Sequence, residues 1–212
     1  ISRDRKLTPD ERKEMKKYSR LADAFTPLAK GMNSEYANQN AYDAISIHGG
    51  SGFIMEYKSQ RLYRDARIFS IYEGTTQLQV VAAVRYITNG TYLNIIKEML
   101  AEEVSDDMKA LLARVEKLVP LYEEAVEKVK NDGNQEEHDF LARRLYDMTA
   151  DIIMSLLIIK DASVAPELFA KSAQVYVRAA EEEVIGHAAY VKAFNAGELQ
   201  YFEAAEPEKT EE

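Results

Sequence analysis

The sequence predicts an all-α protein, and three observations support that prediction. Only 9 glycines and 5 prolines occur in 212 residues, so few positions interrupt a helix. In the C-terminal half, apolar residues recur three or four positions apart with charged residues between them, which is the period of an amphipathic helix. No stretch shows the strict apolar–polar alternation of a half-buried strand. We therefore expect a helical bundle followed by a C-terminal extension of three helices.

The N-terminal part begins with a clear helix start at Thr8-Pro9-Asp10-Glu11, which offers a polar cap, a proline in the first turn and early acids. Pro27 lacks an amide donor and disfavours helix at the preceding residue, so we expect it to end or kink this first helix. The glycine-rich stretch 48–52 then breaks the chain, and an extended segment leads up to residue 71. Further helices are expected over residues 28–47, 57–64 and 75–87.

The C-terminal part follows a break or bend at Thr88-Asn89-Gly90. Its three amphipathic helices are expected at about 108–126, 141–159 and 163–197. Residues 131–137 read as a loop and residues 206–212 as a solvated tail. These patterns predict one domain over residues 1–92 and a helical extension over residues 93–212, in which we find no residues suited to chemistry.

Composition excludes several functions. The 36 acidic residues outnumber the 27 basic ones, giving a net charge of −9, which argues against nucleic-acid binding. There is no cysteine, and the three histidines, at 48, 138 and 187, lie too far apart to suggest a metal site. No apolar run approaches the ~20 residues that span a bilayer. The N-terminus does not resemble a signal peptide, so we expect a cytoplasmic protein.

One short stretch, Ile71-Tyr72-Glu73-Gly74-Thr75, is a candidate catalytic loop. A carboxylate between Ile and Tyr in a partly dry setting loses solvation of its charged form, which makes Glu73 a stronger base. Gly74 allows close approach of backbone and ligand, and the helix start behind it offers free amides to a phosphate or polar cofactor edge. The alternative is an acid in the first turn of a helix, favoured only by the helix dipole. On spacing alone, that alternative is the more common case.

A second stretch, His48-Gly49-Gly50-Ser51-Gly52, forms a tight turn whose amides could cradle a diphosphate. It lacks the lysine and the preceding strand of a P-loop. By itself, an ordinary helix-ending turn explains it better.

The segments IHGGSGF, EY and RLYRDARIFSIYEGTTQLQ occur in this order. Together they resemble the C-terminal helical domain of the acyl-CoA dehydrogenases, over about Leu21 to Tyr86. The resemblance implies that Glu73 removes the α-proton of an acyl-CoA thioester while FAD accepts the β-hydride. It also implies that the Glu73 amide helps to hold the thioester carbonyl and that Tyr72 and Gly74 line the acyl pocket.

The same resemblance implies the cofactor and the partners. Thr75 and Gln77 would contact the flavin or its diphosphate, and the Gly49-Gly50 turn would reach the adenosine end of an FAD that a neighbouring subunit binds. The partners would be an acyl-CoA substrate, an electron-transfer flavoprotein as electron acceptor, and further copies in a homo-oligomer. Residues after about 93 resemble the extra C-terminal helices of the larger, longer-chain members.

Two departures from the family pattern shape the interpretation. Ser46 stands where the family usually has a glutamine that touches FAD. The family's N-terminal helical domain and β-domain have no counterpart in the 212 residues, so we expect a C-terminal fragment with little FAD affinity and no activity alone. The alternative is a non-catalytic oligomerisation or partner-binding module built on the same fold. A free-standing coenzyme A-binding bundle ranks last, because no basic cluster would hold the nucleotide phosphates.

Overall fold

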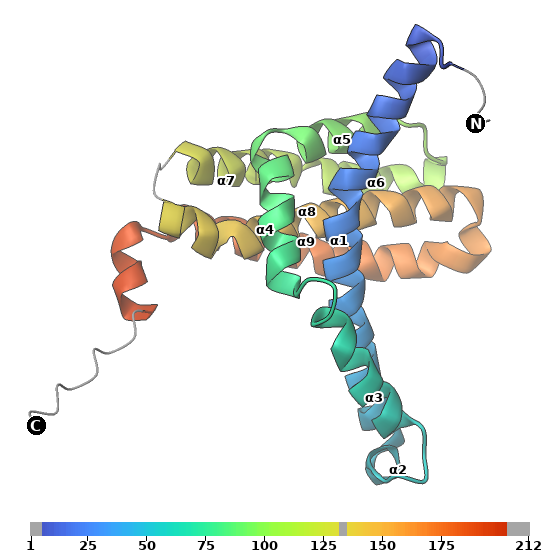
Figure 1. The fold of residues 1–212 in the computed structure, drawn as a ribbon. Coiled ribbons are helices and arrows are strands. Elements are labelled where there is room, and N and C mark those ends of the chain that lie inside the picture. Colours follow the sequence, from blue (N-terminus) through green and yellow to red (C-terminus); the bar gives the residue numbers. More distant parts are fainter. Residues whose placement is uncertain (1–5, 132–134, 203–212) are drawn as a thin grey trace, which may run out of the picture. The chain divides into compact units, whose positions relative to one another are not determined.

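The protein is described by a computed structural model that covers residues 6–131 and 135–202 (Figure 1). Every regular element in these ranges is helical and none is a β-strand, which confirms the all-α prediction. The chain divides into two compact units, Ile1–Asn94 and Ile95–Glu212. Helix α5 (Thr91–Leu100) spans the boundary between them. None of the helices in the described ranges is long and apolar enough to cross a membrane.

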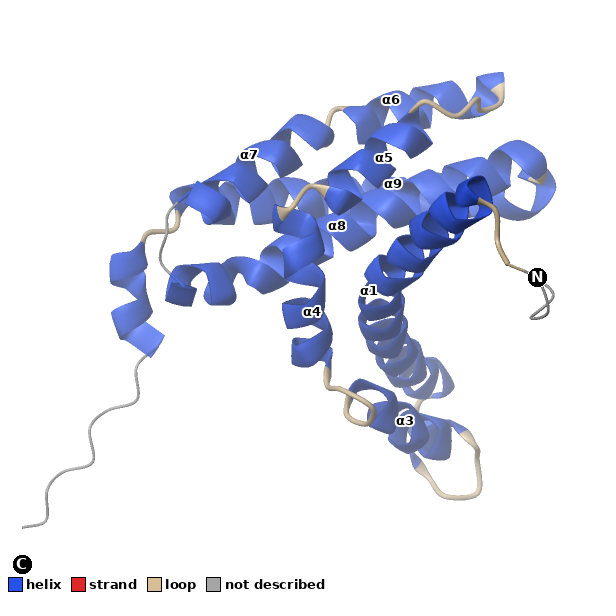
Figure 2. Ribbon diagram, turned by 45° about the horizontal axis from the view of Figure 1, so that its top comes forward, coloured by secondary structure: helices blue, strands red, loops and turns tan. Residues whose placement is uncertain are grey.

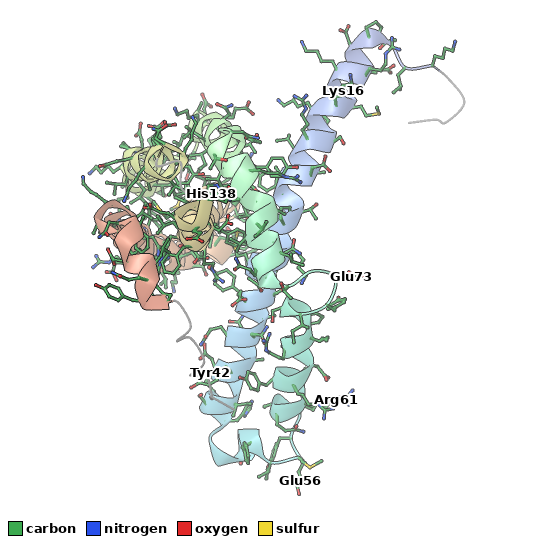
Figure 3. The ribbon with its side chains drawn as sticks, turned by 60° about the vertical axis from the view of Figure 1, so that its left-hand side comes forward. Lys16, Tyr42, Glu56, Arg61, Glu73 and His138 are labelled. Carbon is green, nitrogen blue, oxygen red and sulfur yellow. The ribbon has the colours of Figure 1, made fainter. Side chains whose placement is uncertain are left out.

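The N-terminal unit is built on one long helix, α1 (Pro9–His48). Three shorter helices pack against α1, namely α2 (Gly50–Phe53), α3 (Ser59–Arg67) and α4 (Thr76–Thr88). Figure 3 shows α3 and α4 along successive parts of α1, with the loop that carries Glu73 between them. This loop is therefore fixed by what it contacts on α1.

Helix α1 starts where the sequence predicts and continues through Pro27, which was expected to end or kink it. At its start Thr8 and Glu11 form a capping box, in which the Thr8 amide donates to Glu11 Oε2 at 2.8 Å. Pro27 is buried inside α1, so the predicted division of this helix at Pro27 is wrong. A proline inside a helix costs ~3 kcal/mol, and packing of α2, α3 and α4 along α1 offsets that cost. Figure 2 shows that the axis of α1 changes direction along its length.

The segment before residue 71 is helical, so the prediction of an extended segment there is also wrong. Helix α3 continues to Arg67 and is followed directly by the 3₁₀ turn η1 (Ile68–Ser70). The amides of Ile71 and Tyr72 both donate to the Ile68 carbonyl, at 2.9 and 3.0 Å. A 3₁₀ turn at a helix end is common because it satisfies the last carbonyls, and here it brings the chain back toward α1.

The C-terminal unit contains the 3₁₀ turn η2 (Asp106–Met108) and four long or medium helices. The first of the three predicted helices is two helices in the structure, α6 (Lys109–Glu116) and α7 (Val119–Asn131). Pro120 explains the break: it has no amide to donate to the Glu116 carbonyl, and it is tolerated only in a first turn. The extension therefore contains more than the three predicted helices.

Helices α8 (Gln135–Val164) and α9 (Pro166–Ala193) form a hairpin joined through Ala165. Ser163 lies in the last turn of α8 and does not start α9, and its Oγ lies 2.9 Å from the Ile159 carbonyl oxygen of the same helix. The predicted loop 131–137 is already helical at both of its described ends, and residues 132–134 lie outside the described residues. The predicted tail 206–212 lies outside them as well. The unit ends in the 3₁₀ segment η3 (Ala196–Phe202).

The core of the C-terminal unit lies between α6, α7, α8 and α9. Its side chains are almost entirely removed from solvent; the largest of them are Tyr122, Leu141, Leu145, Tyr146, Met148, Ile152 and Ile159. Within this core, Thr149 Oγ1 lies 3.0 Å from the Tyr122 hydroxyl and 2.7 Å from the Leu145 carbonyl oxygen. Burial raises the pKa of Tyr122 well above its usual range, so this phenol remains neutral.

Candidate active site

The candidate catalytic loop has an unusual backbone. Glu73 has φ 52°, and Gly74 follows with φ 96°. Among the described residues Glu73 is the one non-glycine residue with positive φ, a conformation that costs ~1–2 kcal/mol for such residues. Strain of this kind persists only where the surrounding structure holds it. The structure therefore presents Glu73 on a sharp, constrained turn at the start of α4.

Three polar side chains of α1 hold the segment that leads to Glu73. Lys30 Nζ donates to the Gly74 carbonyl at 2.9 Å and also to the Phe69 carbonyl. One turn further along, Ser34 Oγ lies 3.0 Å from the same Phe69 oxygen. One turn beyond that, Asn38 Nδ2 donates to the Ala66 carbonyl at 3.2 Å. These three residues, at i, i+4 and i+8, form a polar ladder that satisfies the carbonyls at the end of α3 and in the loop.

Position 74 requires glycine for two reasons, namely its positive φ and the closeness of the Gln79 side chain. A Cβ at this position would lie 2.7 Å from Gln79 Nε2. That amide donates to the Gly74 carbonyl at 3.3 Å, so Gln79 adds a second hydrogen bond from α4 to the one from Lys30. In this chain the glycine accommodates the side chain of Gln79.

The surroundings of Glu73 are open. Glu73 is exposed, and its neighbours Ile71 and Tyr72 keep 46% and 45% of their surface accessible. The partly dry setting that the sequence analysis invoked is therefore not supplied by the described residues of this chain. Figure 3 shows Glu73 on the outer side of the loop. Any desolvation of this carboxylate has to come from a bound substrate or from other protein surface.

An open groove of 570 Å³ runs beside the loop. It is lined by Thr26, Ala29, Lys30, Asn33, Ser34 and Ala37 of α1 and by Phe69 and Tyr72. The centroids of the Tyr72 and Phe69 rings lie 6.2 Å apart. Lys30 Nζ lies 5.6 Å from the centroid of the Tyr72 ring. Tyr72 thus borders the groove, with a cation near its ring face.

The start of α4 carries the other residues predicted near Glu73. Thr75, which was predicted to open this helix, is its N-cap, and its Oγ1 accepts from the Leu78 amide at 3.3 Å. Thr76 Oγ1 donates to Glu35 Oε1 on α1 at 2.7 Å. Gln77 is exposed. The loop and the helix start thus bring Tyr72, Glu73, Gly74, Thr75 and Gln77 together in one short segment.

The remaining predicted cofactor residues lie at the other end of α3. Gly49 ends α1 with φ 60°, and a Cβ at Gly49 or Gly50 would meet nothing within 4 Å, so a ligand can approach this backbone closely. Ser46 Oγ donates to its own-helix carbonyl of Tyr42 at 3.4 Å, a weak bond. Helices α2 and α3 and the turn η1 lie between this glycine turn and the Glu73 loop, and α3 alone is about 13 Å long. The predicted cofactor residues therefore lie in two separate places.

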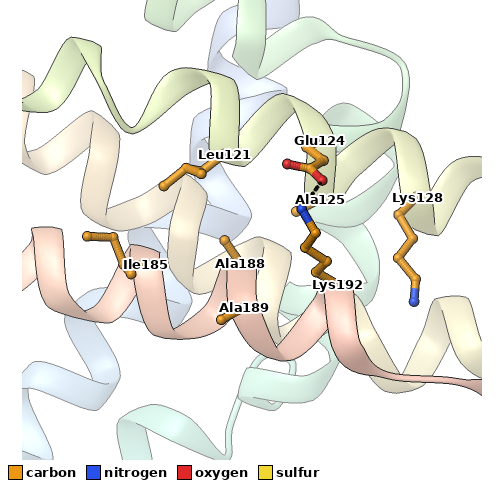
Figure 4. A pocket seen from close by; sticks show the side chains of 8 residues that line it. All are labelled: Leu121, Glu124, Ala125, Lys128, Ile185, Ala188, Ala189 and Lys192. Carbon is orange, nitrogen blue, oxygen red and sulfur yellow. Dashed lines mark hydrogen bonds and ion pairs between the residues drawn. The ribbon is translucent and has the colours of Figure 1, made fainter.

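The C-terminal unit holds a second, smaller cavity of 230 Å³ between α7 and α9 (Figure 4). Its walls are mostly small or aliphatic side chains, and the ion pair between Glu124 and Lys192, at 2.8 Å, closes one side. It contains none of the predicted site residues.

A polar cluster between α8 and α9 was not predicted. The Tyr176 hydroxyl donates to Asp151 Oδ1 at 3.2 Å, and burial raises the pKa of Asp151 to about 7. Nearby, burial also raises the pKa of Asp147 and lowers that of His187. No group of three or more potential metal ligands occurs in the part of the chain that the structure describes.

The sequence analysis also missed Lys30, Ser34 and Asn38. The signal was present as three polar residues at four-residue intervals on a helix whose neighbouring positions 24, 28 and 31 are apolar or small. Periodicity shows that they share a face, but it does not show that a loop packs there.

Two family models match the chain. The model described as "Acyl-CoA dehydrogenase, C-terminal domain" matches residues 10–87. The model described as "Acyl-CoA dehydrogenase C terminal" matches residues 88–199, which is more than half of the chain.

Curated relatives match a short part of the chain at high identity. The chain is 54% identical over 52 residues to the caffeyl-CoA reductase-Etf complex subunit CarC of Acetobacterium woodii, covering 24% of this chain and 14% of that protein. It is 50% identical over 58 residues to a 3-(aryl)acrylate reductase of Clostridium sporogenes, covering 27% of this chain and 15% of that protein. The chain thus spans only a small part of the length of these relatives.

Two solved structures resemble the fold. An acyl-CoA dehydrogenase family protein from Porphyromonas gingivalis has a TM-score of 0.51 at 33% identity, covering 54% of this chain and 98% of that one. An acyl-CoA dehydrogenase from Bacillus anthracis, solved in complex with FAD, has a TM-score of 0.63 at 20% identity, covering 83% of this chain and 34% of that one. The second likeness concerns the fold alone.

Proposed function

Because this chain belongs to the acyl-CoA dehydrogenase family, we propose that it supplies the catalytic base for the α,β-dehydrogenation of an acyl-CoA thioester. The base is Glu73. One observation carries the proposal: the chain holds an exposed glutamate in a strained left-handed conformation, on a loop in which the carbonyls of Phe69 and Gly74 accept hydrogen bonds from Lys30 of α1. A purely structural first-turn acid would not need positive φ, since residues at helix starts adopt ordinary backbone angles.

In the proposed step, the bond between the α-carbon and its hydrogen breaks and the proton passes to a carboxylate oxygen of Glu73. The electron pair forms the new double bond between the α- and β-carbons. A bound FAD would supply the acceptor for the hydride that leaves the β-carbon. The Glu73 amide would donate to the thioester carbonyl, whose oxygen gains negative charge as the α-proton leaves. Tyr72 and Gly74 would line the acyl pocket beside the base.

The residues present fit a flavin dinucleotide in two separate places. The exposed Thr75 and Gln77 at the start of α4 would contact the flavin or its diphosphate, because helix amides there point outward. The open Gly49-Gly50 turn, with Ser46 behind it, would contact the adenosine end of an FAD that belongs to another copy of the protein. We further propose that this chain alone retains little FAD and has no activity, since neither place encloses a ligand by itself.

Partners follow from the same proposal. Large apolar side chains are exposed near the end of α1 and in α2, with Ile47, Phe53 and Met55 keeping 83%, 77% and 86% of their surface accessible. Such surface favours assembly into a homo-oligomer. An electron-transfer flavoprotein would take up the electrons. The relative from Acetobacterium woodii is named as a subunit of a reductase–Etf complex, which supports this partner.

A second candidate function runs the same chemistry in reverse. The two curated relatives described above are named as reductases. In a reductase, a reduced FAD would supply the hydride that adds to the β-carbon of an unsaturated thioester, and Glu73 would give a proton to the α-carbon. Assays in both directions separate the two candidates. A third candidate, a non-catalytic assembly module, predicts no turnover in either direction.

The test uses the longest native protein that contains this chain, with Glu73→Gln as the variant. The amide cannot accept the proton, so turnover should fall by a factor of about 10² to 10⁴ while bound flavin, measured by absorbance, stays unchanged. Glu56→Gln is the matched control, because Glu56 is an exposed glutamate at the far end of α3 (Figure 3). Near-normal turnover in the Glu73 variant would rule out this base.

A separate test concerns the isolated 212-residue chain. It should purify without the absorbance of bound flavin. A yellow preparation would contradict the proposal that the chain alone holds little cofactor.

A further inference from the structure

We propose that Lys30 is a positioning residue for Glu73, acting by holding both ends of the loop that carries this glutamate. The inference deepens the proposed function and rests on it for the catalytic meaning of Glu73. It can fail separately, because the effect of Lys30 on the loop is measurable without any reaction.

The first step is the geometry of the contact. Lys30 Nζ is a single ammonium group that donates to two carbonyls, those of Phe69 and Gly74. These carbonyls belong to the residues at the start and the end of the turn, and Glu73 immediately precedes the second one. One donor on α1 thus fixes the distance across the loop, since an ammonium offers three donors in a compact group.

Two other side chains, those of Ser34 and Gln79, also reach the carbonyls that Lys30 binds. Ser34 Oγ reaches the Phe69 oxygen at 3.0 Å, but it lies closer, at 2.6 Å, to the Lys30 carbonyl oxygen of its own helix. A hydroxyl has one hydrogen, so Ser34 gives the loop only a shared bond. Gln79 reaches Gly74 at 3.3 Å, but it belongs to α4, the helix that follows the loop directly, and so does not tie the loop to α1. Lys30 is therefore the principal tie between the loop and α1.

The third step concerns charge. Lys30 is half-buried, and no carboxylate of a described residue forms an ion pair with it. Its charge is balanced by the two carbonyl dipoles and by the Tyr72 ring at 5.6 Å. A cation bound to carbonyls makes stronger hydrogen bonds than a neutral donor would. This arrangement suits a role in holding backbone in a strained conformation.

The first measurement is made on the 212-residue chain by NMR. Lys30→Met keeps the length of the stem and removes the donor. Hydrogen exchange at the Ile71 and Tyr72 amides, which bond to the Ile68 carbonyl, should quicken by about tenfold or more. The heteronuclear NOE of Glu73 and Gly74 should fall, while amides in α8 keep their wild-type exchange. Lys30→Arg should restore most of the protection, because the guanidinium also bridges two acceptors.

The matched control is Lys16→Met, which removes an exposed lysine from the same helix far from the loop (Figure 3). It should leave the loop amides unchanged. If Lys30→Met leaves them unchanged as well, the proposal is wrong, whatever Glu73 does.

The second measurement is made on the full enzyme. Lys30→Met should lower kcat by between about 10- and 100-fold, with KM altered less than threefold, and Lys30→Arg should recover most of kcat. Full kcat in Lys30→Met, beside an inactive Glu73→Gln, would overturn the positioning role and leave the proposed function standing. A loosened loop beside a fully active Glu73→Gln would overturn the proposed function, and with it the catalytic meaning of Lys30.

Discussion

The longest helices of the two units differ in how many of their residues are buried. Of the 40 residues of α1, five are buried, whereas 14 of the 30 residues of α8 are buried. Helix α8 therefore sits inside a core that its own unit closes, and α1 leaves most of its surface uncovered. Some of this uncovered surface is apolar, with Ile47 and Tyr18 keeping 83% and 60% of their surface accessible, and exposed apolar surface favours binding of other protein or a ligand. The unit with the open helix is also the unit that carries the strained loop.

The contrast extends to how each unit uses polar groups. In the C-terminal unit, the central pair of Thr149 and Tyr122 is fully buried and serves packing. In the N-terminal unit, Lys30 and its neighbours on α1 reach backbone carbonyls of a surface loop. We infer that the C-terminal unit is built for stability and the N-terminal unit for holding one segment in place.

The largest expected effect tests the closed core. Leu145→Ala removes a fully buried side chain of α8 and should lower the free energy of unfolding by about 2–5 kcal/mol, because a cavity remains. Leu62→Ala, on an α3 residue that is 58% exposed, should change it by less than about 0.5 kcal/mol. Urea titrations followed by circular dichroism measure both. Equal effects would remove the distinction between the units.

A smaller effect is expected at the loop. Gly74→Ala places a methyl group 2.7 Å from Gln79 Nε2 and in a left-handed conformation, so it should cost about 1–3 kcal/mol. Gly50→Ala is the matched control, because a Cβ there meets nothing within 4 Å and no positive φ is required. Thermal unfolding of the two variants tests this. A Gly74 variant as stable as the Gly50 variant would show that the loop is not constrained.

The smallest effect concerns pH in the C-terminal unit. Burial raises the pKa of Asp151 from 3.8 to about 7. At pH values between these two, the Asp151 carboxyl keeps its proton in the folded state and has lost it in the unfolded chain. The contribution of Asp151 to stability therefore falls as pH rises from about 4 to 7. Asp151→Asn lacks this decline, and the difference from wild type between pH 5 and 8 should be on the order of 1 kcal/mol. Urea midpoints at several pH values measure it.

The neighbours of Asp151 set the control for that experiment. Asp147 and His187, whose pKa values burial also shifts, are present in both proteins, so their effects largely cancel in the comparison. A pH dependence that is unchanged in Asp151→Asn would mean that this carboxyl is solvated like an ordinary surface acid.

Local signals in the sequence predicted the elements that local chemistry determines. The helix starts near Thr8 and Thr75 and the break at Gly90 between α4 and α5 all lie within a few residues of the signals that predict them. The helical conformation of the segment before Glu73 and the continuation of α1 beyond Pro27 depend on packing between segments that are distant in the sequence. The bond from Lys30 to Gly74 spans 44 residues, which no local pattern can indicate.

The candidate site shows the same limit. The segment from Tyr72 to Gln77 could be chosen from its motif, because its members are adjacent. The left-handed backbone of Glu73 could not, since a glutamate rarely adopts it without tertiary support. The division of the predicted cofactor residues between the two ends of α3 likewise needed the structure.

The most direct test of the central claim is α-proton exchange with solvent. The enzyme is incubated in D₂O with an acyl-CoA in which sulfur replaces the β-carbon, so that no hydride can leave and only the base acts. Our account predicts that wild type incorporates deuterium at the α-carbon, seen by NMR of the thioester, and that Glu73→Gln slows this by about 100-fold or more. Exchange at the wild-type rate in Glu73→Gln would show that another group removes the α-proton.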